Sequence, residues 1–474
     1  MVKLKAPPYR VWIAVMVFMS TFTNYMLRAN MSVSIISMVD KAKKNQTAVC
    51  AAPPDNSTKP PPKPKSGSKK FKWSEIDEGW ILAAYFYGYF FTVLPGGIIS
   101  NYIGPWHTIV WSSLGSAVLT GLTPICATSG GVGGVCANRF FIGFLGGPVY
   151  PAVNDLIAKW APPKEKGKFL AAMMGNTLGT VVTWNLVAAA SSALGWEWGF
   201  HVLAIFMLVY CAVFGVIVRD RPDIHPWVSE DEKKYIAESQ EGRLTTKKGF
   251  PPYHKMMCFN FPFWALVIAQ LGNLWGLNLV LTYAPKFMAG TLGFNIKASA
   301  GLAALPYIAR LIGSNIFGII GDYMRKKEIM SVTKIRKFFI IFSHFIPGAL
   351  LIVMRAFGCI KEGVIAMIVL NQGFNGACVV SHLVNPQDLS PNFAGAVYGI
   401  MNFFGMTTGI FVPMITGFLK TNYKGFTGPT IIFMIGGIVF IGTGVVFVLF
   451  GSGEVQPWNK KEGEEEEQAP AAAK

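Results

Sequence analysis

Residues 11–39 read VWIAVMVFMSTFTNYMLRANMSVSIISMV and contain one charged side chain, Arg28. A helix rises about 1.5 Å per residue, so this stretch is long enough to cross a hydrocarbon core about 30 Å thick. The apolar core of a cleaved signal peptide is shorter, and we therefore expect a retained transmembrane helix. A guanidinium inside a membrane persists where it lines a water-filled cavity or meets an anion. The stretch predicts a membrane helix that carries a functional cation.

Apolar stretches of similar length recur along the whole chain. Including the first, they are 11–39, 76–101, 106–128, 134–160, 166–193, 198–218, 259–288, 296–322, 334–357, 362–384, 391–420 and 428–451. The composition agrees, because 52% of the residues are hydrophobic and 14% are charged, whereas about a quarter of a soluble domain is charged. We predict an all-α membrane protein with twelve transmembrane helices in two six-helix halves.

The distribution of charge predicts the orientation of these spans. Lysine and arginine cluster after spans four, six and eight, and the positive-inside rule places those loops and both termini in the cytosol. The loop at 40–75 is lysine-rich yet predicted to face outward, which is tolerated because long loops cross largely regardless of charge. The predicted parts are a cytosolic N-terminus at 1–10, a first half at 11–218 containing the outward disordered loop 40–75, a cytosolic linker at 219–258, a second half at 259–451 and an acidic disordered tail at 452–474.

The outward side carries candidate modification residues. Asn45 and Asn56 each begin a glycosylation tripeptide within the loop at 40–75. Cys126 and Cys136 bracket the short loop after span three, and a disulfide bridge between them is one expectation.

Several classes of protein are excluded by what the spans contain. No nucleophile with a base and no metal-ligand spacing is present, so we expect neither an enzyme nor a metal site, and no cofactor. The net charge of +17 is spread over loops that flank spans, as topology alone requires, and we reject nucleic acid as a partner. The expected partners are the lipid bilayer and a small anionic substrate, bound by a monomer.

Two loops carry copies of one pattern. After span eight, Asp322 and Arg325 follow two glycines, and after span two Asn101 stands where the aspartate would be. This pattern resembles the signature loop of the major facilitator superfamily, in which a carboxylate at a helix end holds cytosolic cations and stabilises one conformation. The resemblance assigns Asp322, Arg325 and Asn101 to a conformational switch.

Further motifs narrow the resemblance and cover most of the chain. They are Asn24 to Ile35 in span one; Arg139, Gly143, Gly147 and Pro151 in span four; Trp160 to Glu165 after it; Arg221, Pro222 and His225 to Trp227 in the linker; and Asn385, Asp388, Pro391 and Asn402 near spans ten and eleven. They resemble the anion:cation symporter branch, which includes type I sodium/phosphate cotransporters, vesicular glutamate transporters and sialin. Within it, the chain is most similar to invertebrate inorganic phosphate cotransporters.

The intramembrane arginines are the candidate substrate ligands. Arg28 and Arg139 both fall in the outer half of the membrane, and the resemblance assigns substrate contact to both positions. A guanidinium fork suits bidentate contact with phosphate or carboxylate. The alternative is that each arginine packs against backbone carbonyls or extends toward the membrane surface. Tyr25 lies one turn from Arg28, and Arg310 is a third cation at mid-depth with either a substrate role or a structural one.

The expected coupling ion follows from two positions at which this sequence differs from the related carriers. Gly146 and Leu82 stand where related glutamate and sialic acid carriers have an acidic residue and a histidine, which disfavours proton coupling. We interpret His201 and His382 as structural. Sodium is the favoured co-transported ion because backbone carbonyls and neutral side-chain oxygens can bind it. The predicted function is sodium-coupled phosphate or organic anion transport at the plasma membrane; the alternatives are a proton-coupled or facilitative carboxylate or urate carrier, or an anion channel, of an endolysosomal or vesicular membrane.

Overall fold

The computed structural model describes residues 7–40, 50, 70–162, 169, 172–240, 260–391, 393–423 and 425–459. Within these ranges the regular structure is helical, apart from one isolated bridge between Val39 and Phe71. The predicted glycosylation residues Asn45 and Asn56 lie outside the described ranges.

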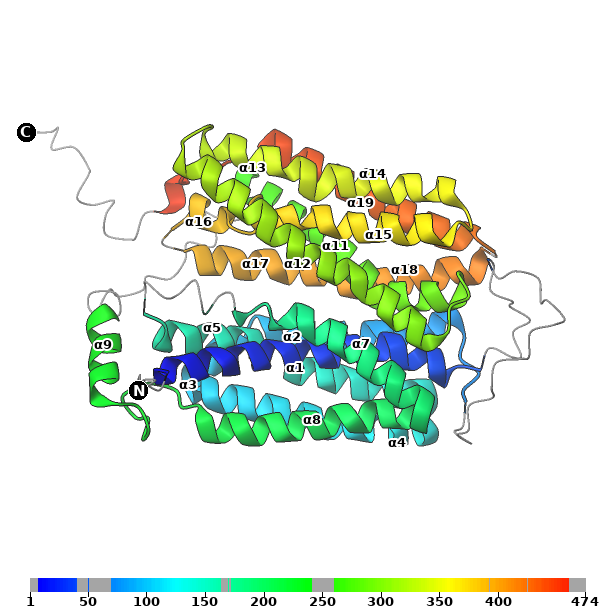
Figure 1. The fold of residues 1–474 in the computed structure, drawn as a ribbon, viewed down its shortest axis with the longest axis horizontal. Coiled ribbons are helices and arrows are strands. Elements are labelled where there is room, and N and C mark those ends of the chain that lie inside the picture. The colour runs from blue at the N-terminus through cyan, green and yellow to red at the C-terminus, as the bar shows by residue number, and fades with distance from the viewer. Residues whose placement is uncertain are drawn as a thin grey trace, which may run out of the picture. The chain divides into compact units, whose positions relative to one another are not determined.

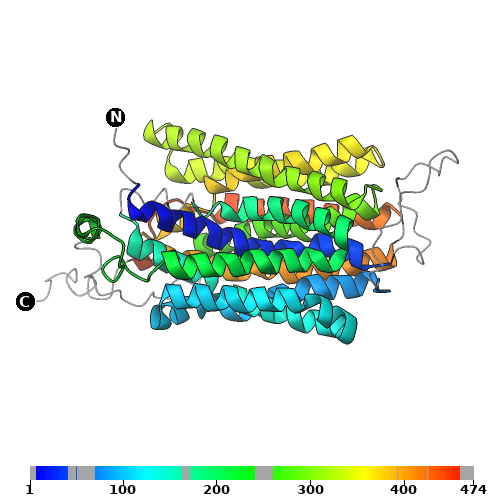
Figure 2. The ribbon, with the colours of Figure 1, turned by 60° about the horizontal axis from the view of Figure 1, so that its bottom comes forward.

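The first helices run from a long span, α1, to a short helix, α9, that lies within the predicted linker (Figure 1). They are α1 (Tyr9–Met38), α2 (Glu75–Val93), α3 (Gly96–Ile103), α4 (Pro105–Gly146), α5 (Val149–Trp160), α7 (Gly175–Leu194), α8 (Trp196–Ile217) and α9 (Glu230–Gln240). Helices α1, α7 and α8 contact one another and run along a common direction in both views (Figures 1 and 2).

The helices after the linker are more interrupted. They are α11 (Phe261–Gly290), α12 (Ile296–Lys326), α13 (Val332–Ile340), the π-helix η1 (Ile341–Phe345), α14 (Ile346–Val353), the 3₁₀ helix η2 (Met354–Phe357), α15 (Lys361–Asn375), the 3₁₀ helix η3 (Gly376–Val379), α16 (Asn385–Leu389), α17 (Ala394–Met406), α18 (Thr408–Asn422), α19 (Thr427–Phe450) and the 3₁₀ helix η4 (Pro457–Asn459).

Nine helical stretches of the described residues are long and apolar enough to cross a membrane. One of them, Pro105–Trp160, has 56 residues and contains two of the predicted spans. Gly131 separates those two, since it has φ 55° and ψ −141°, which only glycine adopts readily. The predicted span at 76–101 corresponds to α2 and α3. The total of twelve spans and the cytosolic termini stay predictions.

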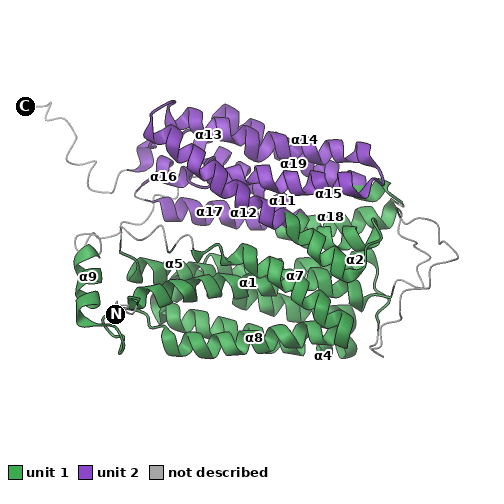
Figure 3. Cartoon of the chain, viewed as in Figure 1, with its two compact units in different colours: residues 1–245, 280–305, 409–429 green, residues 246–279, 306–408, 430–474 purple. Residues whose placement is uncertain are grey.

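The helices form two compact units (Figure 3). The first comprises residues 1–245, 280–305 and 409–429, and the second comprises 246–279, 306–408 and 430–474. The C-terminal part of α11 and nearly all of α18 therefore belong with the helices that precede the linker. The prediction from the sequence separates the two six-helix halves at one place, the linker at 219–258.

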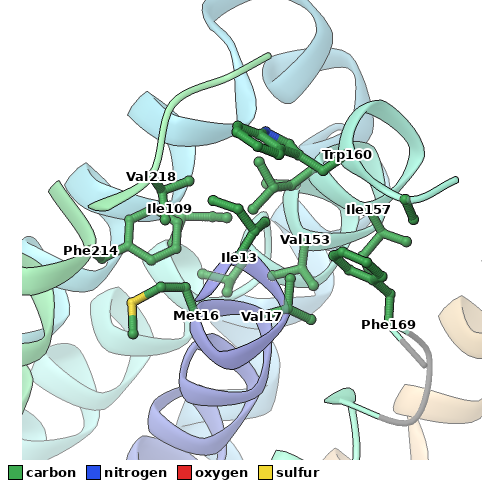
Figure 4. Packing of buried hydrophobic residues seen from close by; sticks show 14 of the residues in the cluster. Ile13, Met16, Val17, Ile109, Val153, Ile157, Trp160, Phe169, Phe214 and Val218 are labelled. Atoms are coloured by element: carbon green, nitrogen blue, oxygen red, sulfur yellow. The ribbon is translucent and has the colours of Figure 1, made fainter. Parts of the chain in front are cut away.

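An apolar cluster fastens one end of the first unit (Figure 4). Ile13 and Val17 of α1 pack with Val153 and Trp160 of α5 and with Phe214 of α8, and all five are fully buried or nearly so. Burial of one such side chain contributes about 2 kcal/mol. The cluster fixes the ends of these helices nearest the linker.

The linker helix α9 caps the N-terminus of α1. Pro8 at the N-cap of α1 offers no side-chain oxygen, so the first amide groups of the helix need another acceptor. The Glu232 carboxylate of α9 accepts from the backbone N–H of Tyr9 at 2.8 Å and of Arg10 at 3.0 Å. An anion at a helix N-terminus is stabilising, and α9 thereby belongs to the folded unit.

The cysteine prediction is wrong. Cys126 and Cys136 are both free thiols, although they lie on either side of the kink at Gly131 in α4. Cys50 and Cys359 are the described cysteines that are disulfide-bonded. Proximity along the chain suggested the first pair, but the helices on either side of Gly131 do not bring the two sulfur atoms into a bond.

Candidate functional site

Arg28 lies within α1 and is 4% exposed, so it faces the protein interior and not the lipid. Its guanidinium carbon lies over the rings of Tyr25 and Tyr89, each at 4.7 Å, and of Phe86 at 5.5 Å and Tyr85 at 5.6 Å. Its Nη1 donates to the Tyr25 hydroxyl at 3.3 Å. A desolvated cation over an aromatic face gains roughly 2 kcal/mol. The rings of α1 and α2 thus form an aromatic enclosure for this cation.

Arg139 reaches the same place from α4 and is 1% exposed. Its Nη1 donates to the Leu27 carbonyl oxygen at 2.8 Å and to Asn30 Oδ1 at 3.2 Å. Its guanidinium carbon lies 5.0 Å from the centre of the Tyr85 ring. Its Nε and Nη2 are buried and have no hydrogen-bond partner among the described residues. The side chain is therefore only half satisfied by the protein.

Two glycines bring α2 and α4 close enough to place Tyr85 beside Arg139. A Cβ atom at Gly143 of α4 would overlap the Tyr85 carbonyl oxygen, and one at Gly88 of α2 would overlap the Phe140 carbonyl oxygen. Glycine at a helix interface permits such backbone contact. The tyrosine ring then lies under both arginines, which a larger residue at either position would prevent.

The geometry joins Arg28, Arg139 and Tyr25 into one site within the first unit. Both guanidinium groups lie over Tyr85, and Arg139 binds the carbonyl oxygen of the residue before Arg28. Two like charges in a low-dielectric interior repel each other unless an anion lies between or beside them. The buried Nε and Nη2 groups of Arg139 also favour an acceptor with several oxygens. The arrangement can bind a small oxyanion.

Arg310 belongs to the second unit, on α12. Its Nη2 donates to Asn273 Oδ1 of α11 at 3.3 Å and lies 3.2 Å from the Cys378 sulfur of η3. Its Nη1 is buried without a hydrogen-bond partner in the described part of the chain. The sequence left a structural role and a substrate role open for Arg310. The structure shows a structural bond to α11 through Nη2, and it leaves the Nη1 donor available to a ligand.

The residues of the predicted conformational switch lie at helix ends. Asp322 and Arg325 are both exposed in the last turns of α12, and neither takes part in an ion pair recorded for the described residues. Asn101 lies in α3. The paired charges near this part of the second unit are Arg336 and Asp388, which form a bidentate ion pair with distances of 2.7 and 3.1 Å.

Sequence reasoning missed two groups of buried polar residues. The first is an ion-pair network in the first unit, made by Glu75, Glu78, Lys286 and Lys420. The second is a histidine pair in the second unit, His344 and His382, each fully buried with ring centres 5.2 Å apart. A charged or titratable residue within an apolar span is the available signal, and it identifies His344, Lys286 and Lys420 in retrospect.

The fold and this cationic interior define a polytopic membrane carrier. The Major Facilitator Superfamily profile matches residues 13–413. Among curated relatives, a Drosophila melanogaster protein named "Putative inorganic phosphate cotransporter" is 32% identical, with 98% of this chain and 88% of the relative covered. Human sialin is 30% identical, with 94% and 90% covered, and vesicular glutamate transporter 1 of Xenopus tropicalis is 29% identical, with 96% and 77% covered.

Solved structures show the same fold. The D-xylose-proton symporter superposes with a TM-score of 0.67 at 15% identity, covering 94% of this chain and all of that one. The chain therefore belongs to the major facilitator superfamily, in the branch that contains the phosphate cotransporters, sialin and the vesicular glutamate transporters. It is an integral membrane transporter and not an enzyme.

Proposed function

We propose that the protein is a secondary active transporter that moves inorganic phosphate or small organic anions in symport with sodium. Alternating access of one central region to the two membrane faces carries the anion across. The protein acts as a monomer in the plasma membrane. Asp322, Arg325 and Asn101 act in the conformational switch at the cytosolic ends of α12 and α3.

One observation carries this proposal: the paired guanidinium groups of Arg28 and Arg139, both enclosed by protein and sharing the ring of Tyr85. Phosphate offers several oxygens to the Nε and Nη2 donors of Arg139 and balances the two positive charges. The name of the Drosophila melanogaster relative supports phosphate as the first anion to examine. Tyr25 orients Arg28, and Arg310 is proposed as a further ligand.

The test is uptake of labelled phosphate by purified protein in proteoliposomes. An inward sodium gradient should drive concentrative uptake that a matched potassium gradient does not. Arg28→Ala should lower the initial rate at least about tenfold, which corresponds to roughly 1.4 kcal/mol of lost stabilisation. Arg221→Ala is the matched control, since Arg221 is 61% exposed and its removal should leave uptake unchanged.

Two results would count against the proposal in different ways. Equal uptake in sodium and potassium contradicts sodium coupling but leaves an anion carrier. Absence of uptake for phosphate and for a panel of carboxylates, urate included, contradicts transport itself. Flux that neither saturates nor concentrates the anion indicates a channel.

The second candidate function is a proton-coupled organic anion carrier of an endolysosomal or vesicular membrane. The buried pair of His344 and His382 favours it, because a histidine inside a membrane span is a group that can bind and release a proton. Replacing the sodium gradient by a proton gradient in the same vesicles distinguishes the two candidates.

A further inference from the structure

Two histidines are enclosed in the second unit. His344 lies in the π-helix η1, and His382 follows η3; neither has any exposed surface. Single turns of π-helix inside α-helices are frequent at functional sites. Each ring nitrogen of both residues lies within hydrogen-bond distance of another polar atom. The nitrogen that carries the proton in each ring therefore follows from which neighbours donate and which accept.

The tautomer of His382 follows from Arg310. A guanidinium has donors only, so Asn273 Oδ1 accepts from Arg310 at 3.3 Å, and Asn273 Nδ2 then donates to Gln270 Oε1 at 3.2 Å. Gln270 Oε1 is consequently an acceptor, and it lies 3.0 Å from His382 Nε2. His382 therefore carries its proton on Nε2, which leaves Nδ1 as an acceptor.

The tautomer of His344 follows from the backbone. Its Nε2 lies 3.0 Å from the Ala269 carbonyl oxygen, which only accepts. The proton of neutral His344 is therefore also on Nε2, and its Nδ1 is an acceptor as well. Both acceptor nitrogens face serine hydroxyls: His344 Nδ1 is 2.8 Å from Ser343 Oγ, and His382 Nδ1 is 3.2 Å from Ser381 Oγ.

The two serines connect the histidines into a chain of three contacts that has one proton too few for three hydrogen bonds. Ser343 Oγ and Ser381 Oγ are 3.1 Å apart, so three close contacts link Nδ1 of His344 to Nδ1 of His382. Two hydroxyl protons can fill only two of these three contacts. One additional proton fills the third and lets every contact be a hydrogen bond. The alternative acceptor for Ser381, the Cys378 carbonyl oxygen, is farther away at 3.4 Å.

We propose that this chain, His344–Ser343–Ser381–His382, is a binding site for one proton, and that its occupancy is linked to an anion held at Arg310. The proton comes from water, binds to Nδ1 of either histidine and returns to water when released; the hydroxyl groups reorient to share it. This inference rests on the proposed carrier function but not on sodium as the driving ion.

The charges around the chain explain the link to the anion. Arg310 is three hydrogen bonds from His382, through Asn273 and Gln270, and its positive charge opposes a second cation nearby. An anion at the buried Nη1 of Arg310 offsets that charge and favours protonation. Neighbouring segments also carry Cys378 of η3, whose sulfur lies 3.2 Å from Arg310 Nη2, and the ion pair of Arg336 on α13 with Asp388 on α16; Arg336 also donates to the Val380 carbonyl oxygen, next to Ser381. Helix α19 has no charged or titratable residue.

Proton uptake upon anion binding tests the proposal directly. Calorimetric titration of the full-length protein with inorganic phosphate, and with sulfate, which does not titrate near neutral pH, is performed in two buffers with different heats of ionisation. The difference between the buffers gives the number of protons taken up. We expect about one proton per bound anion for the wild type.

The variants isolate the histidine chain. His382→Gln should reduce proton uptake to near zero while anion binding persists, and Ser343→Ala should do the same with both imidazoles retained. His201→Gln, which removes a partly buried histidine of α8, should keep the wild-type value. Anion binding without proton uptake in the wild type overturns this inference alone, as does unchanged uptake in both chain variants. Failure of the wild type to bind either anion overturns this inference together with phosphate as the substrate, whereas uptake of a carboxylate by the same protein would still support an anion carrier.

Discussion

Arg28 and Arg139 are held in ways that predict different responses to substitution. Arg28 is enclosed by aromatic rings of α1 and α2, whereas Arg139 is anchored by the Leu27 carbonyl oxygen. Enclosure by rings favours a planar, weakly hydrated cation over a compact ammonium. At position 28, the shape and hydration of the cation should therefore matter for transport as much as its charge.

Arg28→Lys should lower phosphate uptake by more than about tenfold, because the ammonium loses both the fork and the stacking on Tyr25 and Tyr89. Initial rates in proteoliposomes, with reconstituted protein quantified, provide the measurement. Uptake near the wild-type rate would show that charge alone suffices at this position.

Tyr85 should act through its ring and not through its hydroxyl. The ring lies under both arginines, while the hydroxyl oxygen is buried without a hydrogen-bond partner among the described residues. Tyr85→Phe should thus keep anion affinity within about twofold, and Tyr85→Leu should weaken it roughly tenfold through loss of cation–π contacts. Calorimetric titration compares the two, and equal effects would contradict a role for the ring.

At the scale of elements, ion pairs tie α2 to the C-terminal parts of α11 and α18. Lys286 of α11 contacts Glu75 at 3.3 Å and Glu78 at 2.5 Å, and Lys420 of α18 contacts Glu75 at 3.1 Å. Lys286 and Glu78 are each 7% exposed, so neither charge is solvated when its partner is lost. These contacts explain why parts of α11 and α18 belong to the first compact unit.

Lys286→Met should destabilise this arrangement by about 3 kcal/mol, since it leaves the buried Glu78 carboxylate without its lysine while Glu75 keeps Lys420. Thermal unfolding in detergent measures the loss, and Glu78→Gln in the same chain should restore part of it. Lys233→Met is the control: the Lys233 pair with Glu230 is on the surface, so the change should stay within about 0.5 kcal/mol. Equal stability of Lys286→Met and the wild type would contradict a structural role for the network.

At the scale of the whole molecule, the cysteines bear on topology. Cys50 and Cys359 are disulfide-bonded, and both lie in loops that the charge pattern predicts to face outward. Disulfides persist in oxidising compartments, so this agrees with the predicted orientation. Cys126, Cys136, Cys211 and Cys378 are free.

Reduction should make two further thiols reactive in the denatured chain, because Cys50 and Cys359 are released. Mass spectrometry after maleimide labelling, with and without reductant, counts them. Cys126→Ser should lower the count before reduction by one and leave the increase at two. No increase upon reduction would contradict the disulfide-bonded state of these two residues.

Much of the fold was predictable from local sequence. Long apolar stretches with few charges form helices in a membrane, because lipid cannot satisfy backbone polar groups and a helix satisfies them internally. The same stretches identified Arg28 and Arg139 as unusual, since each is a cation without a carboxylate at comparable depth, and Arg310 as a third cation at mid-depth. Motif order indicated the family, and the comparisons confirmed it.

Contacts between distant residues were decided only by the tertiary structure. The shared ring of Tyr85 requires the close approach of α2 and α4, and the network of Lys286 joins residues more than two hundred positions apart. The interpretation of His382 as structural took no account of His344, whose connection runs through two serines on different elements. The sequence by itself determined the membrane helices and their cations, because hydropathy is local. Which cations and histidines meet was determined by packing, because side chains on separate helices become neighbours only after folding.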